Sequence, residues 1–216
     1  PATRNLTAWT HRNSDVTHRA GHPALARVLT PVWSADIGQG DSRKHRITAT
    51  PVAENGRIFT LDALAQITAT SASDGSTLWT HDVTPDGDRK GDASGGGLSL
   101  GAGSLFVTSG FGTITALDPA TGAVKWTHNL EAAASAPATV SGGSVYVVTT
   151  DGVARSLDVA TGRQLWVITG APNITGLTGG SGPAIAGRTV ILPLGSGELL
   201  GGLKTSGIRA WGTSVA

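Results

Sequence analysis

The sequence contains no cysteine and no methionine in 216 residues. The lack of cysteine excludes disulfides, thiolate metal sites and a cysteine nucleophile, and it is compatible with any cellular compartment. Charged residues are scarce, at 14%, and a formal net charge of +1 gives no electrostatic field that would hold nucleic acid. No apolar run reaches the roughly 18 residues that a membrane-spanning helix needs. Because the sequence starts at Pro1 and not at a methionine, the lack of a signal peptide says nothing against export.

Glycine, by contrast, is abundant. The chain has 31 glycines and few helical patterns, a composition typical of an all-β protein rich in turns. Four segments repeat one pattern, in which a glycine precedes a tryptophan by four residues. The pairs are Gly75 and Trp79, Gly122 and Trp126, Gly162 and Trp166, and Gly207 and Trp211. Because glycine tolerates the positive φ of a tight turn, each segment is predicted to form a hairpin with the tryptophan in its second strand.

The spacing of the four tryptophans predicts the architecture. Successive copies lie 40 to 47 residues apart, which is the period of four-stranded blades arranged about an axis. We therefore expect an all-β fold, a β-propeller of four-stranded antiparallel blades, with each indole buried at a joint between neighbouring blades. The chain holds about four blades, expected at residues 46–83, 94–130, 134–169 and 181–215.

Two stretches precede the first complete blade. Residues 1–30 show no periodic pattern and are predicted to form an irregular leader laid over the propeller surface. Residues 31–37, with Trp33, are predicted to form an orphan outer strand of a blade whose three inner strands are missing. Residues 31–216 are therefore interpreted as a partial propeller. The missing blades either follow Ala216 in the parent protein or come from a second polypeptide, because an open arc exposes apolar blade faces.

The repeat resembles that of a known family of propellers. The residues that carry this resemblance are Leu117, Asp118, Thr121, Gly122 and Trp126, which match the repeat of pyrroloquinoline-quinone (PQQ) type propellers. Four stretches of sequence resemble one branch of these propellers, the bacterial BamB lipoproteins. They are the leader around Trp9 and residues 21–25, 31–33 and 171–183. The resemblance covers about residues 7–216.

BamB proteins are eight-bladed periplasmic accessories of the machinery that folds β-barrels into the outer membrane. The resemblance therefore implies that the chain is about half of an eight-bladed propeller and a noncatalytic scaffold without a cofactor. It also implies a periplasmic location, with a tether to the outer membrane in the full-length precursor. The repeat itself is shared with enzymes, so it is specific for the fold and not for the function.

The resemblance also implies a partner and a binding loop. In BamB proteins, the loop that corresponds to residues 171–182 meets a POTRA domain of BamA through two leucine-type side chains followed by an arginine. The matching positions here are Ile174 and Leu177, with one extra residue between them. Thr178 stands where the arginine would be, so the charged part of the contact has no counterpart. The alternative is that Ile174 and Leu177 tuck into an ordinary loop and bind no partner.

Histidines provide no predicted metal site. His81 and His128 each follow a repeat tryptophan by two residues, so they are expected to pack in different blades, too far apart to share a ligand. His11, His18 and His22 have spacings that fit no known set of metal ligands, and they are interpreted as leader residues.

An acidic loop is the other candidate for a cation site. It contains Asp82, Asp86, Asp88 and Asp92. The loop lacks the glycine and the terminal glutamate of a calcium-binding loop, and two basic residues lie within it, so it is interpreted as a solvated loop.

Two other functions compete with the scaffold. A fragment of a PQQ-dependent dehydrogenase is the first, since family enzymes hold the quinone near the propeller axis with a metal, an acidic base and often a cysteine pair. This chain has no cysteine and no cluster of acids in its expected inner strands, which favours the scaffold. The sensor domain of a kinase is the second, and it would need a transmembrane span outside this sequence.

Overall fold

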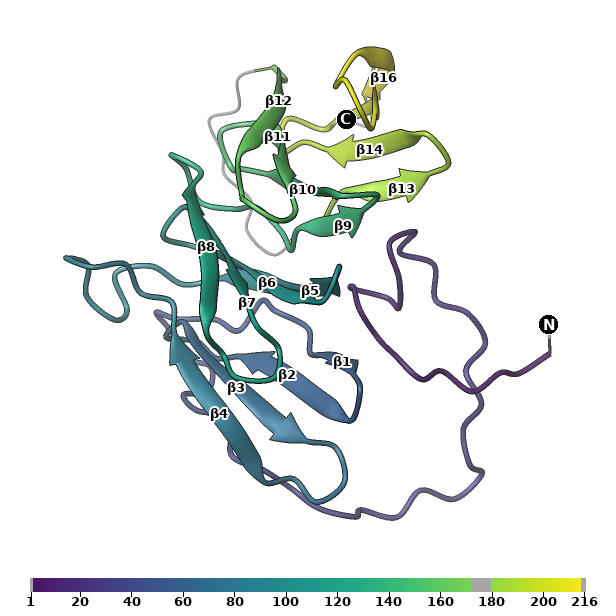
Figure 1. Cartoon of the computed structure of the whole chain (residues 1–216), viewed down its shortest axis with the longest axis vertical. Coiled ribbons are helices and arrows are strands. Elements are labelled where there is room, and N and C mark those ends of the chain that lie inside the picture. Colours follow the sequence, from purple (N-terminus) through teal and green to yellow (C-terminus); the bar gives the residue numbers. More distant parts are fainter. Residues whose placement is uncertain (1, 172–179, 215–216) are drawn as a thin grey trace.

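The structure is a computed structural model, and it describes residues 2–171 and 180–214. These residues form sixteen strands in four antiparallel sheets of four strands each, and no helix is present among them (Figure 1). Each sheet takes its strands in chain order, so neighbours along the chain are also neighbours in the sheet. The predicted all-β fold of four-stranded antiparallel blades is therefore confirmed.

The first two sheets lie in the N-terminal half of the chain. The first sheet consists of β1 (Val52–Glu54), β2 (Arg57–Leu61), β3 (Gln66–Ser71) and β4 (Thr77–Asp82). The second consists of β5 (Gly96–Gly101), β6 (Ser104–Ser109), β7 (Thr113–Leu117) and β8 (Val124–Asn129).

The other two sheets follow the same plan. The third sheet consists of β9 (Thr139–Ser141), β10 (Ser144–Val148), β11 (Val153–Asp158) and β12 (Gln164–Thr169). The fourth consists of β13 (Ala184–Ala186), β14 (Thr189–Pro193), β15 (Glu198–Leu203) and β16 (Arg209–Ser214).

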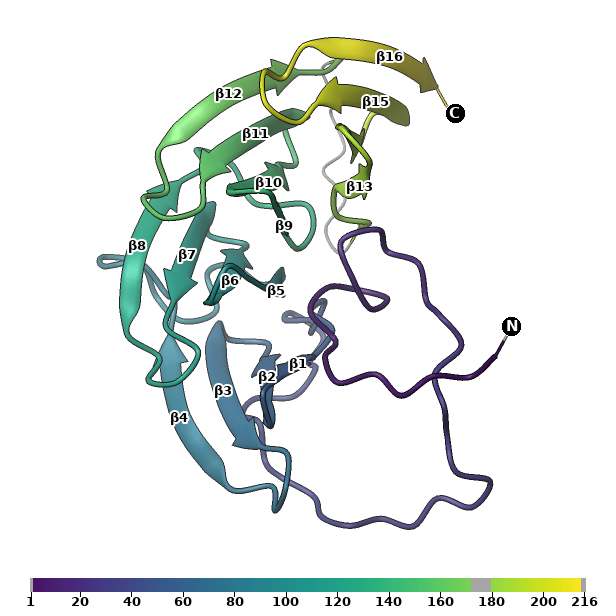
Figure 2. The same ribbon diagram turned by 45° about the vertical axis from the view of Figure 1, so that its right-hand side comes forward.

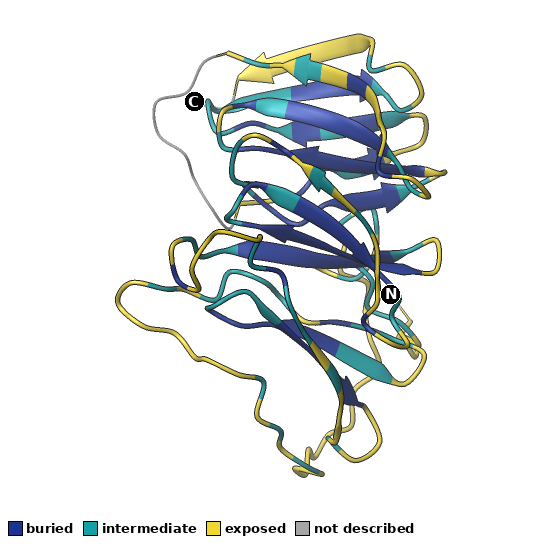
Figure 3. Ribbon diagram, turned by 60° about the vertical axis from the view of Figure 1, so that its left-hand side comes forward, coloured by how far each residue is buried: buried dark blue, intermediate teal, exposed yellow. Residues whose placement is uncertain are grey.

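The sheets stand side by side in an arc about an axis (Figure 2). The first strand of each sheet, β1, β5, β9 and β13, lies on the inner side of the arc, and the fourth strand lies on the outer side. Apolar clusters fill the space between successive sheets, so the core consists of seams between blades and has no single centre. Figure 3 shows the consequence, with buried middle strands and an exposed last strand β16.

The second strands of the two middle sheets, β6 and β10, are covered on both faces. Every residue of β6 and β10 is buried. An aromatic ring at the same place in each of the first three sheets packs against the tryptophan of that sheet, with ring centroids 5.7 to 5.8 Å apart. These pairs are Phe59 and Trp79, Phe106 and Trp126, and Tyr146 and Trp166.

The outer strand predicted at residues 31–37 does not form. This segment belongs to none of the four sheets. A strand persists through hydrogen bonds to a neighbouring strand, and no inner strands of a fifth sheet occur among the described residues to provide them. The segment still brings Trp33 to the first sheet, as described below.

Candidate interaction surface

A tryptophan and a glycine meet at every seam. The indole Nε1 of one sheet donates a hydrogen bond to a backbone carbonyl in the last hairpin of the next sheet, at 2.9 to 3.2 Å. The donor and acceptor pairs are Trp33 to Ala72, Trp79 to Pro119, Trp126 to Val159, and Trp166 to Lys204. Trp33 thus takes the seam position of an outer-strand tryptophan although its segment forms no strand.

The glycine in each hairpin is required by the ring that lies on it. Gly75, Gly122, Gly162 and Gly207 all have φ between 69° and 76°. A Cβ atom at any of them would lie 2.6 to 2.8 Å from an indole, that of Trp33 for Gly75 and that of the preceding sheet for the other three. A side chain is therefore excluded by both the backbone conformation and the close approach of the ring.

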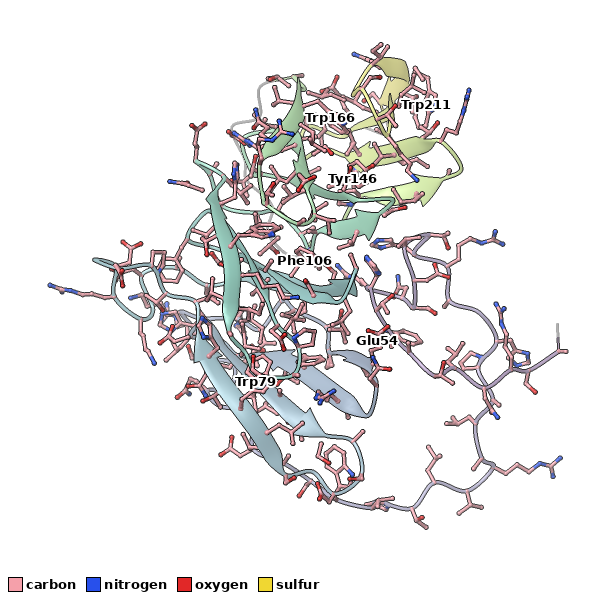
Figure 4. All side chains as sticks on the ribbon, in the orientation of Figure 1. Glu54, Trp79, Phe106, Tyr146, Trp166 and Trp211 are labelled. Carbon is pink, nitrogen blue, oxygen red and sulfur yellow. The ribbon has the colours of Figure 1, made fainter. Side chains whose placement is uncertain are left out.

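The prediction that all four repeat tryptophans are buried is met in full only by Trp166, since Trp79 and Trp126 are half-buried and Trp211 is exposed. Trp211 departs furthest from it. It is 41% exposed, whereas Trp166 at the same place in the third sheet is 9% exposed. The difference arises because no sheet beyond the fourth covers Trp211 among the described residues (Figure 4). Ile208, in the adjoining turn, is also exposed.

The leader follows the inner edge of all four sheets (Figure 2). Its residues 9–16 form a hydrogen bond to the first strand of every sheet. In the first two sheets, Trp9 pairs with Ala53 of β1, and the carbonyl of Thr10 accepts a hydrogen bond from the N–H of Leu100 in β5 at 2.8 Å. In the last two sheets, Nε2 of His11 accepts from the N–H of Val140 in β9 at 3.1 Å, and the carbonyl of Val16 accepts from the N–H of Ile185 in β13 at 2.9 Å. The leader therefore covers the inner strands, at the place where an axial ligand would contact them.

His11 is the buried polar group of this leader contact. The side chain is 2% exposed, and its Nδ1 lies 2.9 Å from the Thr10 hydroxyl. Burial, followed by the charge of His18, lowers the pKa of His11 from 6.5 to about 4, while Asp15 acts in the opposite direction. His11 is therefore neutral at pH 7 and accepts the Val140 N–H through an unprotonated Nε2.

The predicted partner-binding residues, Ile174 and Leu177, lie outside the described residues. The two ends of their loop are described, and both are tied to the propeller. At one end, the backbone N–H of Ala171 donates to Glu198 Oε2 at 2.6 Å. At the other, the backbone N–H of Gly180 donates to the carbonyl of Ser135 at 3.1 Å, so hydrogen bonds fix where the loop leaves and rejoins the sheets.

The leader also holds the second end of this loop. Arg12 donates a hydrogen bond from a terminal guanidinium nitrogen to the carbonyl of Gly180 at 2.7 Å. Sequence reasoning missed both Arg12 and Glu198. The contacts join residues 168 and 27 positions apart, and no periodic pattern signals them.

Of the histidines considered for metal binding, His11 and His18 lie close together, with ring centroids 6.3 Å apart. No group of three or more potential metal-ligating side chains occurs within residues 2–171 and 180–214. In the acidic loop, Asp82 forms an ion pair with Lys90 at 2.7 Å and accepts the Thr84 N–H at 2.9 Å. These partners lower the pKa of the Asp82 carboxyl against the opposing effect of burial.

The family profile described as "Outer membrane protein assembly factor BamB" matches residues 63–216. The chain belongs to this BamB family. The match begins just after β2 and includes all four glycine and tryptophan pairs of the repeat. No curated protein matches the chain in sequence.

Solved structures of similar fold include BamB itself and enzymes. BamB from Moraxella catarrhalis has a TM-score of 0.63 and 21% identity over 83% of this chain and 52% of its own. Quinohemoprotein alcohol dehydrogenase ADHIIG from Pseudomonas putida HK5 has a TM-score of 0.73 and 16% identity over 97% of this chain and 40% of its own. The quinohemoprotein alcohol dehydrogenase from Comamonas testosteroni has a TM-score of 0.73 and 16% identity over 98% of this chain and 42% of its own.

These structural likenesses define the fold of this BamB-family chain and leave its function open, because all three identities are low. The chain spans about half or less of the length of each of these proteins. Within the described part of the chain, no helix is long and apolar enough to cross a membrane.

Proposed function

We propose that the chain is a noncatalytic scaffold of outer-membrane β-barrel assembly. Membership of the BamB family is the observation that carries this proposal. The partner is a POTRA domain of a BamA-like protein, and the site of action is the periplasm, with the full-length precursor tethered to the outer membrane. No chemical step is required of the chain, because its role is to bind and position the partner.

The loop between β12 and β13 is the proposed contact. Ile174 and Leu177 act as apolar anchors within a polar surround, an arrangement in which a few side chains dominate the binding free energy. The hydrogen bonds of Ala171 to Glu198 and of Gly180 to Ser135 and Arg12 support this role. Fixed ends reduce the conformational entropy that the loop loses when a partner binds.

A fragment of a PQQ-dependent dehydrogenase is the second candidate, favoured by the fold likeness to two quinohemoprotein alcohol dehydrogenases. Two features oppose it. The leader covers the inner edge of the sheets, where an axial quinone would lie. Among the four inner strands, which are described in full, Glu54 is the one carboxylate. Titration with quinone and calcium distinguishes the candidates: absorbance change or thermal stabilisation supports the enzyme, and the lack of both supports the scaffold.

The decisive experiment measures the affinity of the chain for the POTRA segment of a BamA-like protein. We expect Ile174→Asp and Leu177→Asp each to weaken binding by about tenfold or more, since a charge would replace an apolar anchor. Ile208→Asp is the matched control, because Ile208 is an apolar side chain, 63% exposed, in the β15–β16 turn. This turn lies at the opposite end of the sheet from the β12–β13 connection, so the control leaves the affinity unchanged. Unchanged binding in both loop variants removes the site assignment, and no binding by the native chain overturns the scaffold.

A further inference from the structure

A cavity of about 360 Å³ lies at the seam between the third and fourth sheets. It is lined by the β9–β10 turn on one side and by the β13–β14 and β15–β16 turns on the other. Arg188 and Lys204 are both part of this lining, and no carboxylate is. Tyr146 forms the inner wall, between the two sheets (Figure 4).

The backbone of Lys204 is held in place by the seam. Its carbonyl accepts hydrogen bonds from Trp166 Nε1 at 2.9 Å and from the Tyr146 hydroxyl at 3.3 Å. Its N–H donates to the carbonyl of Arg188 at 3.0 Å, which joins the two turns that carry the cations. The position of both residues is therefore set by the fold and does not depend on a ligand.

Within the part of the chain that the structure describes, neither of these two side chains forms an ion pair with a carboxylate. Lys204 Nζ donates to the Ser141 hydroxyl at 3.2 Å, so one of its three donors is used by a neutral group. The Arg188 guanidinium is exposed and forms no hydrogen bond or ion pair with the described residues. Two uncompensated cations thus border one cavity.

The seam between the first and second sheets provides a direct comparison. A cavity of about 280 Å³ lies there, lined by the corresponding turns, and its lining includes Glu54, Arg57 and Asp118. Glu54 is equivalent to Ser141, since each is the last residue of the first strand of its sheet and pairs with the first residue of the second strand. Asp118 is equivalent to Leu203, since each carbonyl accepts the N–H of the seam glycine four residues later.

The cations occupy positions that are neutral in the first seam. Lys204 is equivalent to Pro119, because both carbonyls accept a seam tryptophan. Arg188 is equivalent to Gly103, the second residue of the corresponding two-residue turn.

From the first to the last seam, therefore, two carboxylates are replaced by neutral residues and two neutral residues by cations. One cation, Arg57, is replaced by the neutral Ser144, so the net formal charge of the lining still changes from negative to positive. The repeat architecture is unchanged, so the charge reversal is not a requirement of the fold.

We propose that the cavity between the third and fourth sheets binds a phosphate group through Arg188 and Lys204. Phosphate carries a charge between about −1.5 and −2 near neutral pH and has several strong acceptor oxygens, which match one guanidinium and one ammonium donor. Ser144 also lines the cavity, so its polar lining extends beyond the two cations. The group is either a soluble phosphate or phosphate ester, or the headgroup of an anionic phospholipid.

This site is separate from the proposed partner loop. The turns that line the cavity join the first to the second and the third to the fourth strand of their sheets, whereas the β12–β13 connection leaves from the opposite ends of the strands. The phosphate proposal therefore does not depend on POTRA binding, and each can fail without the other.

Titration of the isotopically labelled chain with inorganic phosphate tests the site by NMR. We expect saturable shifts of the Gly142, Gly187 and Lys204 amides, with a dissociation constant of about 1 mM, as for a solvent-exposed site with two cations. Arg188→Gln and Lys204→Gln each weaken binding by about tenfold, the effect of losing one charge-assisted hydrogen bond. Arg57→Gln, which removes the cation of the first-seam cavity, leaves the affinity unchanged.

Leu203→Asp is the sharpest variant. It restores the carboxylate that Asp118 and Asp158 provide in the two preceding sheets, in a turn of the same length. In those sheets the carboxylate accepts backbone N–H groups of its own turn, so the fold is expected to persist. Phosphate binding is lost because a negative charge now faces the ligand.

Vesicles distinguish the two sources of phosphate. A lipid headgroup is supported if the chain sediments with phosphatidylglycerol vesicles but not with phosphatidylcholine vesicles, and if the Leu203→Asp variant no longer sediments with the former. Saturable phosphate binding without sedimentation supports a soluble ligand. The proposal is overturned if native chain shows no saturable shift, if the Arg188 and Lys204 variants bind as tightly as native chain, or if acetate binds as tightly as phosphate.

Discussion

The ring of His11 accepts a hydrogen bond from the backbone N–H of Val140, 129 residues further along the chain, at 3.1 Å. The acceptor is Nε2, so the proton of the neutral ring is on Nδ1, beside the Thr10 hydroxyl. This contact links the leader to the inner strand of the third sheet. It requires an unprotonated ring nitrogen, and the burial that lowers the pKa of His11 to about 4 maintains that state at neutral pH.

The first prediction concerns the dependence of stability on pH. The pKa of His11 is about 4 in the folded chain and 6.5 in the unfolded chain, so the unfolded state binds more protons between these values. The stabilising effect of the neutral ring is complete above about pH 6.5 and is lost as the pH falls toward 4. The loss is on the order of 3 kcal/mol, at 1.36 kcal/mol per pH unit. Urea denaturation at successive pH values between 7 and 4.5 measures it.

His11→Gln is the control for this prediction. The amide oxygen of glutamine accepts a hydrogen bond and does not titrate, so the decline between pH 6.5 and 4.5 is expected to be smaller in the variant than in the native chain. Part of the decline remains, because burial also lowers the pKa of His18 and of His128. Equal slopes for native and His11→Gln chains would show that His11 does not titrate as described.

The seams were predictable from the sequence, whereas the leader contacts were not. Gly122 and Trp126 belong to a pattern repeated every 40 to 47 residues, and a repeated pattern reports a repeated local environment. The contact of His11 is not predictable, because its partner Val140 is remote in sequence and contributes a backbone N–H, a group that every residue except proline has. Leader contacts of this kind follow from the assembled inner edge of four sheets.

Trp211 shows the limit of the repeat argument. Its sequence context predicts the same burial as Trp166, yet it is 41% exposed. A seam forms between two sheets, whereas each copy of the sequence pattern specifies only one sheet. The pattern alone therefore does not show whether a neighbouring sheet covers the tryptophan. The candidate partner residues Ile174 and Leu177 illustrate a second limit, because their assignment rests on a family resemblance and on no physical feature of the loop itself.

The second prediction tests the close approach of ring and turn at the seams. Gly122→Ala is expected to destabilise the chain by about 2 to 4 kcal/mol, since its Cβ would lie 2.7 Å from the Trp79 ring and its φ is +74°. Gly56→Ala is the matched control, because Gly56 has a φ of +72° and no atom within 4 Å of the added Cβ. It retains only the backbone cost of about 1 to 2 kcal/mol. Equal losses in thermal or urea denaturation would show that the seam tolerates a side chain.

The third prediction concerns the anchor at the start of the proposed partner loop. Glu198→Ala removes the acceptor of the Ala171 N–H, a bond of 2.6 Å to a carboxylate. We expect hydrogen exchange at Ala171 to accelerate by about tenfold or more, the effect of losing a charge-assisted hydrogen bond. Ser196→Ala is the control, since Ser196 donates to the same carboxylate at 3.1 Å but does not contact Ala171. If exchange at Ala171 is equally fast in both variants, Glu198 does not fix this end of the loop.

The fourth prediction compares the same residue type at a complete and at an uncovered seam. Trp166 donates to Lys204, packs against Tyr146 and contacts Gly207, whereas Trp211 is 41% exposed on an outer strand. Trp166→Ala is therefore expected to cost about 3 to 5 kcal/mol, the range for a buried tryptophan. Trp211→Ala is expected to cost about 2 kcal/mol less than Trp166→Ala, because a larger part of the Trp211 ring is already exposed to solvent. Urea denaturation of both variants measures the difference, and equal losses would show that Trp211 is as well packed as the tryptophans of the complete seams.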